Sequence, residues 1–259
     1  MSYYFKSKNY VMKKKLLSIC LFSAVLIITA CSKSNDNTTN SSSGFSNTPL
    51  AKAAYDNNNF GIYKGVFVGS TGNAEINVNN DNTLKAVLKI NGTTSTYTSA
   101  QTVTQNQAST INFASGSNSF TFSTSATGAS PLISNINIAG HAYSGMSVLK
   151  EKSDSLVKCY EGTFTSSGSG GTFNLEIKNN IMNGLYNEIG ATIPPPRIYG
   201  TVNNNQLSGT APTDPQIFLP QCGYAGTTIT GTISADGEKI NGTYSNCYGS
   251  GTWTGVRTK

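Results

Sequence analysis

The chain has 259 residues, of which 37% are hydrophobic and 12% charged, and its formal net charge is +6 at neutral pH. Five of its 18 basic residues and none of its 12 acidic residues precede residue 31, so the remainder carries 13 minus 12, a net charge of about +1. That remainder contains no cluster of Lys and Arg, and nucleic-acid binding requires one. Charge and composition therefore exclude nucleic acid as a partner.

The N-terminus contains an apolar run of 15 residues, Leu16 to Ala30, behind three consecutive lysines. As a helix this run would reach about 22 Å, which is short of the ~30 Å hydrocarbon core of a bilayer. A basic flank, a short apolar core and small residues at its end indicate an export signal rather than a membrane span. We therefore expect residues 1–30 to be a signal peptide.

The run ends in Ile28-Thr29-Ala30-Cys31, and these four residues resemble the lipobox of bacterial lipoproteins. The resemblance implies that Cys31 is lipidated, that everything before it is removed, and that the protein is held at a membrane. Several acyl chains make such an attachment durable, whereas one chain binds only marginally. In Gram-negative lipoproteins an Asp after the cysteine causes retention at the inner membrane. Here Ser32 follows, which implies the outer membrane, on its periplasmic or its cell-surface face.

Residues 31–59 are rich in Ser, Asn and Thr and contain few large apolar residues. Such a segment buries too little surface to offset the entropy of ordering it, so we expect a flexible tether between lipid and body.

From residue 60 to 149, short segments of alternating apolar and polar residues are separated by Gly and Asn clusters, which is the pattern of strands joined by tight turns. Asn91-Gly92 is the most specific turn signal, because a type I′ turn needs positive φ at both central residues. The predicted strands are Tyr63 to Val68, Ala74 to Val78, Leu84 to Ile90, Thr94 to Val103, Thr110 to Ala114, Ser119 to Ser123, Ile133 to Ile138 and Tyr143 to Leu149.

A charged segment, Lys150 to Ser155, separates this part from residues 157–259. After it the sequence restarts, because Tyr160-Glu161-Gly162-Thr163-Phe164 repeats the pattern of Tyr63-Lys64-Gly65-Val66-Phe67. The repeat predicts an internal duplication.

The second part repeats a motif in which a glycine lies between apolar residues. A glycine inside a strand permits a sharp bend or the close packing of a ring over the bare backbone. We therefore predict an all-β fold of two antiparallel up-and-down meanders, each closed or nearly closed into a small barrel; one large β-sandwich is the alternative. The glycines are Gly162, Gly184, Gly200, Gly209, Gly231, Gly242 and Gly251, and candidate rings are Phe164, Tyr186, Tyr199, Tyr244 and Trp253.

Cys159, Cys222 and Cys247 follow the lipid site. Disulfides form in oxidising compartments outside the cytoplasm, and a hairpin about Asp236-Gly237 would place residue 222 within a few positions of the residue facing Cys247. We therefore predict a disulfide between Cys222 and Cys247. Cys159 is then a half-buried strand residue or an alternative partner. The chain has no Cys-x-x-Cys or Cys/His cluster, so we expect no metal site and no cofactor.

Catalysis has little support in the sequence. The one histidine, His141, begins a predicted strand, and no Gly-x-Ser-x-Gly elbow accompanies it. Glycoside hydrolysis would need two carboxyl groups about 5 to 10 Å apart in a cleft. The candidates are Glu75, Glu161, Glu176 and Glu188; Glu176 alternates with two apolar residues, so we expect it to be solvated.

Of the chain's 13 tyrosines, three precede residue 31, so ten tyrosines and one tryptophan remain in a body of low charge. Small barrels can hold one small ligand, and exposed rings beside amides can bind a sugar or a peptide. We therefore expect a non-enzymatic binding or accessory module for a small hydrophobic, sugar or peptide ligand. Arg197 and Tyr199, beside Pro194 to Pro196, are the candidate binding residues. The alternatives are a secreted hydrolase that uses carboxylates, and a surface adhesin or structural protein.

Overall fold

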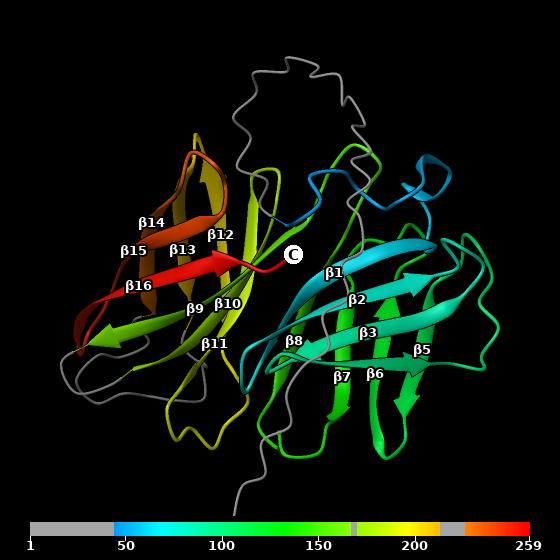
Figure 1. Ribbon diagram of the computed structural model, residues 1–259, viewed down its shortest axis with the longest axis horizontal. Helices are drawn as coiled ribbons and strands as arrows, with labels where there is room; N and C mark the ends of the chain where they lie inside the picture. The colour runs from blue at the N-terminus through cyan, green and yellow to red at the C-terminus, as the bar shows by residue number, and fades with distance from the viewer. Residues whose placement is uncertain (1–43, 167–169, 213–225) are drawn as a thin grey trace, which may run out of the picture. The chain divides into compact units, whose positions relative to one another are not determined.

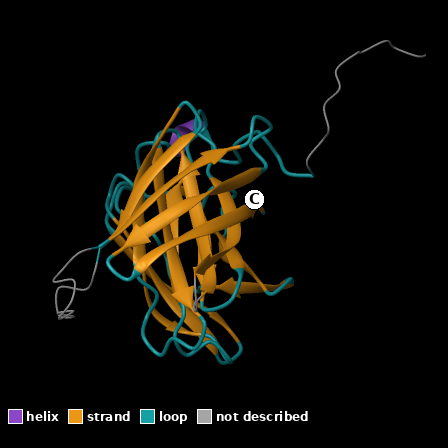
Figure 2. Ribbon diagram, turned by 90° about the vertical axis from the view of Figure 1, so that its left-hand side faces the viewer, coloured by secondary structure: helices purple, strands orange, loops and turns teal. Residues whose placement is uncertain are grey.

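The computed structural model describes residues 44–166, 170–212 and 226–259. These residues form 16 strands in two antiparallel eight-stranded sheets. Helix in the described part is confined to one 3₁₀ turn, η1 (Ala53–Tyr55), coloured purple in Figure 2. The predicted all-β fold of two barrel-like meanders is confirmed, and the single sandwich is not formed. The predicted signal peptide and the predicted lipid site, Cys31, lie outside the described residues.

The N-terminal sheet has the strand order β7-β6-β5-β4-β3-β2-β1-β8 (Figure 1). It is a meander in which the last strand, β8, pairs with the first, while β7 and β8 are neighbours without a ladder between them. The sheet is therefore a nearly closed barrel. Its strands are β1 (Gly61–Val68), β2 (Gly72–Val78), β3 (Leu84–Ile90), β4 (Thr93–Thr98), β5 (Ser109–Ser115), β6 (Asn118–Thr124), β7 (Leu132–Asn137) and β8 (Gly145–Lys150).

The C-terminal sheet closes completely, in the order β10-β11-β12-β13-β14-β15-β16-β9. The first strand, β9, pairs with both β10 and the last strand, β16, so this barrel has no free edge. Its strands are β9 (Lys158–Ser166), β10 (Gly170–Lys178), β11 (Ile181–Glu188), β12 (Arg197–Asn203), β13 (Gln206–Ala211), β14 (Thr227–Ile233), β15 (Lys239–Asn246) and β16 (Gly249–Arg257).

The two sheets share a local design at their first strands. Tyr63 in β1 and Tyr160 in β9 are both fully buried. Two residues further on, Gly65 and Gly162 approach the last strand of their own sheet so closely that a Cβ would lie 1.8 Å from Ser147 O and 2.3 Å from Thr254 O. The repeated Tyr-x-Gly pattern thus occupies equivalent places, which supports the internal duplication.

The outer faces of the sheets pack against each other, and β1 is consequently buried along its whole length. Val66 of β1 contacts Val157 and Cys159 in a small apolar cluster. Beside this cluster, Asn174 Nδ2 of β10 donates to the Phe67 carbonyl oxygen at 2.6 Å. Outward-facing residues at this contact, such as Cys159 of β9 and Asn174 of β10, are therefore interior residues of the whole body.

Residues 45–52, here called the N-terminal strap, contact both sheets. Arg257 at the end of β16 donates to the Ser46 carbonyl oxygen at 2.7 Å. The Leu50 amide donates to Glu151 Oε1 at 2.6 Å. The sequence predicts a flexible tether up to residue 59, whereas the strap is attached to the body. Hydrogen bonds between its backbone and the buried side chains of Arg257 and Glu151 hold it there in place of apolar contacts.

Candidate binding cavity

The interior of the C-terminal barrel is hollow at one end. The cavity has a volume of about 360 Å³, within the range of roughly 300–1,000 Å³ typical of small-molecule sites. Ten apolar or aromatic side chains form most of its described wall. They are Phe164, Phe173, Leu175, Tyr186, Ile198, Ala211, Ile229, Tyr244, Tyr248 and Trp253.

The directions of the lining strands show at which end of the barrel the mouth of this cavity lies. Lining residues lie at the ends of β9, β11, β13 and β15 and at the beginnings of β10, β12, β14 and β16. In an antiparallel barrel these strand ends meet at one rim. The exposed Tyr248 ring, 65% accessible, lies in the turn between β15 and β16 at that rim.

Glycines make room for the rings on the wall. A Cβ on Gly251 would lie 2.5 Å from Tyr244 Cε1, and a Cβ on Gly231 would lie 2.3 Å from Trp253 Cζ2. Only a glycine permits such an approach. The rings therefore lie against bare backbone rather than across the barrel, which leaves the axis open at this end.

The other end of the barrel is filled. Tyr160 is fully buried and its hydroxyl donates to the Gly237 carbonyl oxygen at 2.8 Å. Arg257, 3% exposed, closes the same end together with Glu238, at 3.2 Å. The pKa of Lys158 is lowered there by burial and by the charge of Arg257. The basic groups that face inward thus lie at the filled end, and the cavity is a cup rather than a channel.

The mouth carries an acidic group. Glu188 lies at the end of β11 on the same face as Tyr186, and both line the cavity. Burial raises the pKa of Tyr186, and the negative charge of Glu188 raises it further. Of the described residues that line the cavity, Glu188 is the one with a charged side chain. The described part of the mouth therefore carries a negative charge.

The two predicted binding residues lie elsewhere. Ile198 of β12 faces the cavity, so its neighbours Arg197 and Tyr199 point to the outside of the barrel. Burial raises the pKa of Glu176, and the nearby positive charge of Arg197 offsets part of that rise. Tyr199 is 47% exposed on the outer surface. The structure does not bring these residues into the cavity.

The cysteines differ in state. Cys247 is disulfide-bonded and lies in the turn at the mouth, between the lining residues Asn246 and Tyr248. Cys222 lies outside the described residues, so its pairing with Cys247 stays a prediction. Cys159 is a free, fully buried thiol that donates to the Gly65 carbonyl oxygen at 3.4 Å. Burial raises the pKa of Cys159, so it is a packed thiol and not a partner of Cys247.

The expectation that Glu176 is solvated was wrong. Its side chain does point away from the barrel interior, but the N-terminal sheet covers it and it is 0% exposed. Ser147 Oγ donates to Oε1 at 2.5 Å, while Oε2 has no hydrogen-bond partner among the described residues. Burial outweighs this hydrogen bond and the charge of Arg197, and raises the pKa of Glu176 to about 8.

The remaining acidic candidates are held by partners outside the cavity. Glu75 forms an ion pair with Lys259 at 3.0 Å, and Glu161 accepts hydrogen bonds from Thr71 and Asn73 across the contact between the sheets. His141 Nδ1 lies 3.4 Å from Ser70 Oγ, and its ring packs edge-on against Phe67. Two carboxylates do not converge in the described part of the cavity.

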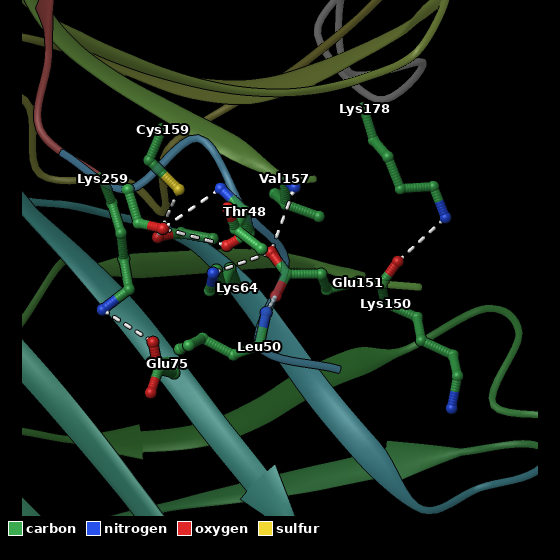
Figure 3. Close-up of polar contacts among 12 residues, drawn as sticks. Thr48, Leu50, Lys64, Glu75, Lys150, Glu151, Val157, Cys159, Lys178 and Lys259 are labelled. Carbon is green, nitrogen blue, oxygen red and sulfur yellow. Dashed lines mark hydrogen bonds and ion pairs between the residues drawn. The ribbon is translucent and has the colours of Figure 1, made fainter. Parts of the chain in front are cut away.

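Glu151 joins three segments at the contact between the sheets (Figure 3). It is 0% exposed and forms an ion pair with Lys64 of β1, at 2.7 Å. It also accepts the amide of Leu50 at 2.6 Å and that of Val157 at 3.3 Å. The charged segment predicted as a junction therefore supplies the polar centre of the body.

No known protein family, no curated protein and no solved structure matches this chain. Within residues 44–166, 170–212 and 226–259, no group of three or more His, Cys, Asp and Glu side chains is placed to hold a metal ion. No helix in these ranges is both long and apolar enough to cross a membrane.

Sequence reasoning missed most of the cavity wall. The glycine motif indicates only that rings cover bare backbone, and the candidates for these rings include Phe164, Tyr186, Tyr244 and Trp253. The sequence marks Glu188 only as a candidate for a pair of catalytic acids. Counting every second residue from a motif glycine would have identified them, because such residues share one face of a strand. Tyr186 and Glu188 lie two and four residues after Gly184 and therefore share its inward face.

Proposed function

We propose that this protein is a lipid-anchored binding protein of the cell envelope whose C-terminal barrel holds a small, largely apolar ligand. The observation that carries the proposal is the cavity of about 360 Å³ with six aromatic rings on its wall. Small-molecule sites combine such walls with a few polar groups that orient the ligand. Here Thr227, Asn246 and Ser250 supply polar groups.

The number of acidic residues in the described cavity lining favours a binding role over hydrolysis. Hydrolysis by paired carboxylates needs two acids on either side of a scissile bond, whereas the described lining contains one. A solidly filled body with a flat aromatic surface would have favoured an adhesin. The hollow barrel favours a carrier or an accessory to nutrient capture instead.

Ligand binding is tested with the chain's one tryptophan, Trp253, which lies on the cavity wall. The neutral fluorophore N-phenyl-1-naphthylamine should bind and accept excitation energy from Trp253. Filling the cavity with Ala211→Phe should weaken binding at least about tenfold, or about 1.4 kcal/mol, because Ala211 lines the cavity. Thr210→Phe places the same ring on the exposed outer face of β13, so it should bind like the wild type. Equal affinities of the two variants would contradict the proposal.

The lipid anchor is proposed from Ile28-Thr29-Ala30-Cys31, and with it the membrane as a partner and the outer membrane, on its periplasmic or cell-surface face, as the location. We expect Cys31→Ser to abolish incorporation of radiolabelled palmitate and to leave the signal peptide uncleaved. Cys20→Ser, a matched change inside the signal, should be labelled and processed normally. Label that persists in Cys31→Ser, or processing that globomycin does not inhibit, would refute the anchor.

A further inference from the structure

We infer that the cavity selects small organic cations, which insert an aromatic or aliphatic body into the cup and leave an ammonium group at the mouth. This inference rests on the proposed binding function and names its ligand class. Two independent features support it. One is the sign of the charge at the mouth, and the other is the aromatic character of the wall.

The charge is distributed unevenly along the barrel. Glu188 is at the mouth, and within the described lining no Lys, Arg or His faces the cavity. The inward-facing basic residues Lys158 and Arg257 belong to the filled end. Lys158 is eight residues from Ser166 along β9, or about 26 Å at ~3.3 Å per residue. A carboxylate ligand would therefore find no counter-ion, and an ammonium group at the mouth would find Glu188.

The wall adds a second attraction for cations. The face of an aromatic ring is negative and attracts an ammonium group within about 6 Å of its centroid. Phe164 forms T-shaped contacts with Tyr186 and Tyr244, with ring centroids 6.0 and 5.7 Å apart, and Tyr248 adds an exposed residue at the mouth. The field of Glu188 also reaches Tyr186, since it raises the pKa of that phenol. The aromatic rings and the Glu188 carboxylate thus both favour a ligand group with a positive charge.

The test compares three probes that share one body and differ in head group: 4-phenylbutylamine, 4-phenylbutanol and 4-phenylbutyrate. The full chain is reconstituted in phosphatidylcholine vesicles at pH 7, and binding is followed by Trp253 fluorescence. The Ala211→Phe chain in the same vesicles supplies the background from partitioning into lipid. We expect the amine to bind between about threefold and thirtyfold more tightly than the alcohol, and the carboxylate to bind more weakly than the alcohol.

Glu188→Gln should reduce the ratio of amine to alcohol affinity several-fold. Asp154→Asn removes the same charge at an exposed site in the segment between the sheets and should leave the ratio unchanged. An amine that binds no more tightly than the alcohol, or a carboxylate that binds as tightly, overturns the inference while the binding function stands. An unchanged ratio in Glu188→Gln overturns the role of Glu188. If none of the three probes binds above the Ala211→Phe background, the binding function itself fails.

Discussion

Replacing Glu176 with glutamine should stabilise the protein at alkaline pH by several kcal/mol relative to the wild type. The pKa of Glu176 is raised from 4.5 to about 8 by burial. Between these values the unfolded chain has lost a proton that the folded chain keeps, so the wild type loses stability as pH rises through this window. The loss is about 1.4 kcal/mol per pH unit and is complete above pH 8. Glutamine does not ionise, so the variant should not show this loss.

Urea unfolding followed by Trp253 fluorescence at several values between pH 4 and pH 9 measures this effect. The informative quantity is the difference in unfolding free energy between Glu176→Gln and the wild type, which should grow from pH 4.5 to pH 8 and then stay constant. Glu75→Gln is the matched control, because it makes the same chemical change at a partly exposed carboxyl. A difference for Glu176→Gln that does not change with pH would show that the site is solvated.

Truncating Glu151 should be the more damaging change at neutral pH. Glu151→Ala leaves Lys64, 4% exposed, as a buried charge without its partner, and removes the acceptor of the Leu50 and Val157 amides. Breaking a buried ion pair on one side typically costs 3–5 kcal/mol. Calorimetry should show a much lower melting temperature, together with faster proteolysis of residues 45–52, because the N-terminal strap loses a hydrogen bond.

The contrasting variant is Glu75→Ala, which breaks an ion pair whose side chains are 27% and 21% exposed. Exposed pairs contribute roughly 0–1 kcal/mol, so this variant should melt within a few degrees of the wild type. Similar losses in the two variants would mean that Glu151 is accessible to water.

The strands were predictable where alternation and turn residues agree. Asn91 and Gly92 have φ values of 50° and 79°, as the predicted type I′ turn requires, and the strand before them, Leu84–Ile90, has its predicted limits. The strand predicted from Thr94 to Val103 ends earlier, at Thr98. Beyond Thr98, the backbone amide of Asn112 donates to the Gln101 side chain, at 2.6 Å from Oε1, instead of to a backbone carbonyl of the neighbouring segment. The alternation of apolar and polar residues does not show where a side chain takes the place of a backbone acceptor.

The contact between the sheets was not predictable, because alternation shows which residues share a face but not what covers that face. Glu176 and Asn174 have the pattern of solvated strand residues, yet both are fully buried. The cavity was missed for a related reason. A pattern of inward apolar residues is the same for a filled and a hollow barrel, and the difference depends on whether rings such as Tyr244 lie over a glycine or across the axis.

The N-terminal strap has a consequence for the route by which a ligand arrives. It meets the barrel at Arg257, the last residue of β16, whereas the mouth lies at Gly249, the first. Eight residue steps along this strand span about 26 Å. The strap is therefore fixed to the filled base of the barrel and does not cover the rim, so a ligand can enter the cavity without displacing it.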